Sequence, residues 1–147
     1  ALDADLLVRT LVKHGQMVSF FNDVTVGAND ERIHAAQYFG TKGFFASYDA
    51  RLDDPLDPKT AEAWVTGLDY LIVKKLKPEA LAARLAKLDT HDVKPMSGAQ
   101  FMATLRQTKS LSTTDVDAAT SVENAKPEQV LTRGEACRIM ARLLPTN

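Results

Sequence analysis

The chain has 147 residues, a length that suits one domain with a buried core. Hydrophobic residues make up 45% of it and charged residues 25%, which is ordinary for a globular protein and excludes a disordered one. The 18 basic residues nearly balance 19 acidic ones without forming a basic block, and no apolar run is long enough to cross a bilayer, so we expect neither a nucleic-acid partner nor a membrane span.

Apolar side chains recur at helical spacing in six stretches of the chain. Asp3 can cap the first stretch, and Gly43 follows the second where a left-handed residue is favoured. Pro58 stands at the first helical position of the third. The predicted helices are about Asp3–His14, Asn29–Lys42, Asp57–Leu76, Pro78–Leu88, Ser97–Leu105 and Thr132–Leu143.

The last two helices begin with capping boxes. Ser97 is followed three residues later by Gln100, and Thr132 by Glu135. In such a box the hydroxyl accepts a hydrogen bond from the third amide, and the longer side chain accepts one from the amide of the cap residue. These two helix starts are therefore the sharpest predictions of local structure in the chain.

No segment alternates apolar and polar residues over the length of a typical strand, so we predict an all-α fold. Val24–Val26 and Phe44–Tyr48 are candidates for short extended pieces. Two long connections, Phe44–Leu56 and Ser110–Val130, are expected to be functional or mobile.

Comparing the chain with itself indicates a repeat of helix, long loop and capped helix. The residues from Leu56 to Ala61 align with those from Leu131 to Ala136, and the opening residues 2–6 fit the same position. We therefore predict one helical module made of units at about 1–28, 29–76 and 97–144. Residues 77–96, with the predicted helix Pro78–Leu88, are then an insertion or a substitute for the missing half of a unit.

This layout resembles the S-layer homology (SLH) repeat. Phe21–Val24 is similar to the opening Phe-x-Asp-Val of that family, and Leu131–Ala136 is similar to its Leu-Thr-Arg-Ala-Glu box. The resemblance implies a non-catalytic module at the cell envelope, outside the cytoplasm, that binds an anionic glycan with no cofactor. It also implies a ligand-binding site at Arg133, with Thr132 and Glu135 beside it.

The chain departs from the family pattern at the box arginine. The two positions aligned with Arg133 hold Pro58 and Ala4, and the second unit lacks the glycine that ends the first helix. The helical fold can therefore carry over without the glycan binding.

A second resemblance concerns residues 35–45, Ala-Ala-Gln-Tyr-Phe-Gly-Thr-Lys-Gly-Phe-Phe. They are similar to tails of large secreted FAD-dependent oxidoreductases. The alternative function is therefore a structural or interaction tail of such an enzyme, with the rest of the parent polypeptide as partner. The start at Ala1, which is neither a methionine nor part of a signal peptide, also indicates a processed product or an excised piece.

The other chemical candidates point to structure more than to function. The three histidines are far apart in sequence, and the aspartates at 49, 53, 54 and 57 lack the glycine and glutamate of an EF-hand, so we predict no metal site. Cys137 lies among core positions, and no serine or cysteine sits in a nucleophile turn, so we predict no catalytic residue and no complete enzyme. The aromatic residues between 20 and 48 suit a core better than a sugar platform.

Arg133 is the strongest candidate for binding. It lies at a helix N-terminus, where backbone amides favour anions, and its planar fork suits a carboxylate or a phosphate. As a first-turn surface residue it is expected to contribute little to folding.

Overall fold

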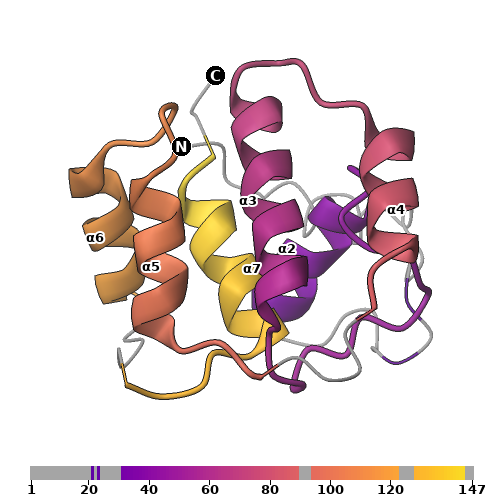
Figure 1. Cartoon of the computed structure of the whole chain (residues 1–147), viewed down its shortest axis with the longest axis horizontal. Coiled ribbons are helices and arrows are strands. Elements are labelled where there is room, and N and C mark those ends of the chain that lie inside the picture. The colour runs from indigo at the N-terminus through magenta and orange to yellow at the C-terminus, as the bar shows by residue number, and fades with distance from the viewer. Residues whose placement is uncertain (1–20, 22, 24–30, 90–93, 123–127, 145–147) are drawn as a thin grey trace.

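The computed structural model describes residues 21, 23, 31–89, 94–122 and 128–144. Within them the fold is all-α, as predicted, with two isolated β-bridges and no strand. Figure 1 shows α3, α5 and α7 in the middle of the molecule, α4 and α6 at opposite ends, and α2 behind α3. The described helices are α2 (Glu31–Gly40), α3 (Pro58–Ile72), α4 (Pro78–Ala86), α5 (Gly98–Arg106), α6 (Thr113–Val122) and α7 (Arg133–Arg142).

Five of the predicted helices are confirmed, with small differences at their ends. α3 stops at Ile72 rather than near Leu76, because Lys74 adopts a positive φ of 60° and turns the chain toward α4. Gly43 has the left-handed φ of 83° that its position predicted. The helix expected at Asp3–His14 and the extended piece at Val24–Val26 lie outside the described residues.

The prediction of one long connection between Ser110 and Val130 was wrong, because α6 forms within it. The Ser112 hydroxyl accepts a hydrogen bond from the Asp115 amide at 3.1 Å, which is the bond of a helix N-cap. Val116, 0% exposed, and Ala119 then face the core one turn apart. The many threonines and aspartates in this segment concealed its helical spacing.

Three capped helices start from one shared backbone arrangement. The residues before their caps form a closed set of hydrogen bonds: the Leu56 amide donates to the Leu131 carbonyl, the Leu131 amide to the Met96 carbonyl, and the Met96 amide to the Leu56 carbonyl, at 2.8–2.9 Å. All three side chains are buried. The cap residues that follow, Asp57 and its two counterparts, share an extended conformation with ψ between 155° and 163°. The three segments are therefore equivalent positions of a pseudo-threefold arrangement.

The helix pairs follow the same threefold order. α4 packs on α3, α6 packs on α5, and α2 packs on α7, so the first helix of each unit lies against the capped helix of another unit. In chain order, each of the capped helices α3, α5 and α7 directly follows the first helix of its own unit, so the units are α2 with α3, α4 with α5, and α6 with α7. Residues 77–96 contain α4, which stands directly before the capped helix α5 and so takes the place of a first helix, in line with the prediction of a substitute for a missing half-unit.

The core is rich in aromatic rings contributed by α2, α3 and the loop between them. Phe39 and Phe44 pack with ring centroids 4.7 Å apart, and the Trp64 indole N–H donates to the Phe44 carbonyl at 2.7 Å. Tyr48, by contrast, is 66% exposed. The expectation that most of these aromatics form core is confirmed for the described ones. Among the described helices, none combines the length and the apolar character that crossing a bilayer requires.

Candidate functional site

The loop between α2 and α3 is held in place by the motif that contains Phe21 and Asp23. Both oxygens of the Asp23 carboxylate accept backbone hydrogen bonds, from the amides of Ala50 and Arg51, each at 2.8 Å. Phe21 is buried and meets Phe45 edge-on, with centroids 4.8 Å apart. Arg51 has a positive φ of 53°, a conformation that the two Asp23 bonds help to fix. Phe21 and Asp23 therefore hold this loop in position.

Arg133 is buried, which corrects the expectation of a surface residue in the first turn. Only 6% of it is exposed, because its side chain extends under the loop between α2 and α3. The guanidinium carbon lies 5.0 Å from the ring centroid of Trp64 and 5.5 Å from that of Phe45, close enough for cation–π attraction to both. Arg133 is thus part of the core as well as a candidate for binding, and changing it is expected to affect folding.

The guanidinium of Arg133 is only partly satisfied by the protein. Its Nε–H donates to the Ala50 carbonyl at 3.0 Å, and that is the one hydrogen bond it makes within the described residues. No carboxylate of the described chain forms an ion pair with it. Burial lowers the pKa of Arg133, and the positive charge of Arg51 lowers it further. Because buried charges are normally paired, an arginine with two terminal nitrogens available is an unusual arrangement.

A pocket of about 180 Å³ opens beside this guanidinium. The rings of Phe44 and Phe45 line it together with polar groups. A second cation, Arg51, also lines it, and the Arg51 side chain is 54% exposed. Asp49, whose carboxylate is a hydrogen-bond acceptor, also lines it. The pocket is smaller than typical small-molecule sites, which begin near 300 Å³, so it suits one sugar ring or one acidic substituent.

The N-terminus of α7 does not itself provide an anion site. The amides of Arg133 and Gly134 donate to the carbonyls of Asp54 and Leu52, both at 2.9 Å. The Glu135 amide donates to the Thr132 hydroxyl at 3.1 Å. Since the free first-turn amides are all used, a ligand here would meet the Arg133 side chain and not the helix terminus.

Thr132 and Glu135 form the predicted capping box. The Thr132 amide donates to the Glu135 carboxylate at 3.0 Å, and the two side chains are also joined at 2.9 Å. Neither residue lines the pocket beside Arg133. Of the three predicted site residues, Arg133 therefore reaches the pocket, while the other two fix the helix that carries it.

The remaining candidates have structural roles where the structure describes them. His34 is buried in α2 rather than solvated. Asp57 caps α3 through the Thr60 amide, and Asp53 pairs with Arg32 at 2.8 Å. Within the described residues, no group of three histidine, cysteine, aspartate or glutamate side chains is placed to hold a metal ion.

Comparisons of the chain with family models, with curated proteins and with solved structures give no match.

Proposed function

We propose that this chain is a non-catalytic binding module that holds an acidic substituent of a cell-envelope glycan in the pocket beside Arg133. The observation that carries the proposal is the buried guanidinium whose Nε alone is bonded, with a pocket at its open side. A carboxylate there would accept two parallel hydrogen bonds, which is the geometry that a guanidinium fork favours.

The rest of the pocket supports a sugar acid over a simple inorganic anion. Arg51 adds a second positive charge, and Asp49 supplies an acceptor that suits a sugar hydroxyl. Phe44 and Phe45 provide apolar walls for the face of a ring. A single small site binds weakly, so the proposal implies avidity, either from a repeating polysaccharide or from other modules of a parent protein.

The test is calorimetric titration of the purified chain with a glucuronic acid oligosaccharide and with a neutral glucan of equal length. We expect binding of the acidic sugar only, and weakening as salt is added. Arg51→Gln should raise Kd about fivefold, which corresponds to roughly 1 kcal/mol for a partly exposed charge contact. Arg106→Gln is the matched control, because Arg106 is another half-exposed arginine that does not line the pocket.

Arg133→Lys and Arg133→Ala test the fork itself. We expect about tenfold weaker binding for lysine, and binding too weak to measure for alanine. Because Arg133 is buried, each variant needs a denaturation curve showing that it remains folded. Equal affinity for the two sugars, or binding that is indifferent to Arg51→Gln and Arg133→Lys, would contradict the proposal. It would then favour the alternative, a structural tail of a larger FAD-dependent oxidoreductase.

A further inference from the structure

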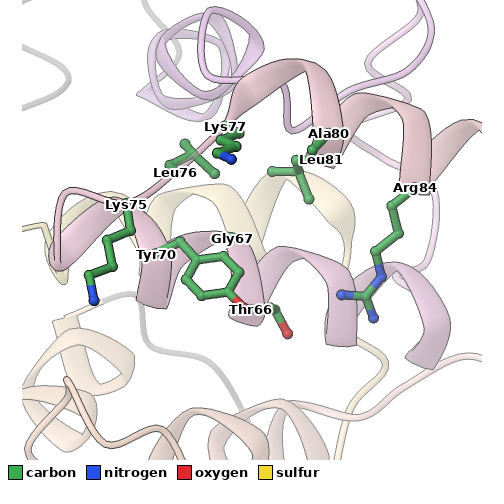
Figure 2. A pocket seen from close by; sticks show the side chains of 9 residues that line it. All are labelled: Thr66, Gly67, Tyr70, Lys75, Leu76, Lys77, Ala80, Leu81 and Arg84. Atoms are coloured by element: carbon green, nitrogen blue, oxygen red, sulfur yellow. The ribbon is translucent and has the colours of Figure 1, made fainter.

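A second pocket, of about 330 Å³, lies between α3 and α4. It shares no lining residue with the pocket beside Arg133. Figure 2 shows Leu76 and Leu81 at the space between the helices, with Tyr70 and Arg84 on either side of it. Its volume falls within the range of small-molecule sites.

The two helices meet closely at the base of this pocket, and the residues there are apolar. Gly67 of α3 has no side chain, and a Cβ atom at that position would lie 2.7 Å from Leu81 Cδ2 of α4. Tyr70 extends the apolar wall outward, and 48% of it is exposed. The pocket thus offers an apolar interior with an aromatic side.

The rim of the pocket carries charges of one sign. Lys75, Lys77 and Arg84 line it, and no acidic residue does. The nearest counter-charge in the described structure is Glu62, 3.9 Å from the Arg84 guanidinium and 75% exposed, so water weakens this pair. Lys77, at the N-cap position of α4, is exposed.

We infer that this pocket binds a small amphiphilic anion, with an aliphatic or aromatic body and one carboxylate. The body lies against Leu76, Leu81 and the Tyr70 ring, and the carboxylate faces the cations of the rim. Charge complementarity selects this ligand class, because a neutral apolar molecule gains nothing from the positive rim and a cationic amphiphile meets repulsion.

The test is an NMR titration of the full chain with octanoate and, separately, with octylammonium, which has the same alkyl length and opposite charge. Octanoate should give saturable shifts of amide signals from α3 and α4, and octylammonium should bind at least about tenfold more weakly. Arg84→Gln should raise the Kd for octanoate several-fold and make it less dependent on salt.

Two alanines of α4 provide a matched pair of variants. Both are exposed, but Ala80 lines the pocket and Ala83 does not. Ala80→Glu places a carboxylate at the rim and should weaken octanoate binding about tenfold, whereas Ala83→Glu should change it less than about twofold. Absence of saturable shifts, equal binding of octylammonium, or equal effects of the two substitutions would overturn the inference.

Discussion

Cys137 shows how strongly the centre of this protein is shielded from water. Its side chain is fully buried, and this burial raises the pKa of the thiol to about 12, while the positive charge of Arg133 lowers it slightly. An ordinary thiol ionises near pH 8.5. The folded protein therefore keeps the proton at a pH where the unfolded chain loses it, and stability falls as pH rises through about 9 to 11.

We expect the thiol to resist 5,5′-dithiobis-(2-nitrobenzoate) at about pH 8 in the native protein and to react once the chain unfolds, because only the thiolate is nucleophilic. The denaturation midpoint should also decline less between about pH 9 and 11 in Cys137→Ala than in the parent chain. Rapid labelling of the native protein would show that the thiol is accessible. Identical pH slopes in the two chains would show that burial does not raise the pKa of the thiol.

Gly43 is the residue whose replacement should be most damaging. Its φ is 83°, and a Cβ atom would lie 2.1 Å from the Pro78 carbonyl oxygen at the start of α4. Gly43→Ala combines backbone strain with a backbone clash, so we expect a loss of more than about 2 kcal/mol, measured by urea denaturation. A loss below about 0.5 kcal/mol would mean that α4 shifts freely.

Lys74 provides the opposite substitution. It is an exposed non-glycine residue with a φ of 60°, just after α3. Lys74→Gly relieves this conformation at a position where glycine is preferred, so we expect a gain of about 0.5–1 kcal/mol in the same assay. Destabilisation by Lys74→Gly would indicate that its side chain contributes more than its backbone costs.

At the scale of elements, the caps determine where the helices start. Thr132→Ala removes the acceptor for the Glu135 amide and should cost about 1 kcal/mol, read from the shift of a urea midpoint. Ser97→Ala should cost a similar amount, because its box has the same bonds. Thr132→Ser, which keeps the acceptor, is the control. A midpoint unchanged in Thr132→Ala would mean that water replaces the cap.

These caps also explain what could be predicted from the sequence. Short-range signals, such as Pro58 after Asp57 and the box at Ser97, specify helix starts through contacts within four residues. The depth of Arg133 could not be predicted, because it depends on the loop around Ala50, 83 positions away in the chain. The pocket was missed for the same reason.

At the scale of the whole molecule, three segments of the structure share the order of apolar residue, cap and helix, and the sequence pattern predicts two of them, at Leu56 and Leu131. The likeness of Leu56–Ala61 to Leu131–Ala136 predicts the repeat, and the opening residues 2–6, which fit the same pattern, lie outside the described residues. The segment Met96–Gln100 has the same order of apolar residue, cap and capping partner, and it occupies the third position in the backbone arrangement. Its lack of a residue like Arg133 concealed the equivalence.

The packing of helices between units favours cooperative unfolding. Because α2 packs on α7, α4 on α3 and α6 on α5, no unit buries its own apolar faces alone. The chain is thus expected to unfold in one step, unlike an open array in which each repeat contacts only its sequence neighbours.

The single tryptophan makes this expectation measurable. Trp64 fluorescence reports on α3, while circular dichroism at 222 nm reports on all helices, and the two urea midpoints should coincide. Ser97→Ala, in the middle unit, should lower both midpoints equally, although Ser97 belongs to a different helix from Trp64. If the fluorescence midpoint stays in place while the dichroism midpoint falls, the units unfold separately. The closed set of bonds among Leu56, Met96 and Leu131 would then not couple them.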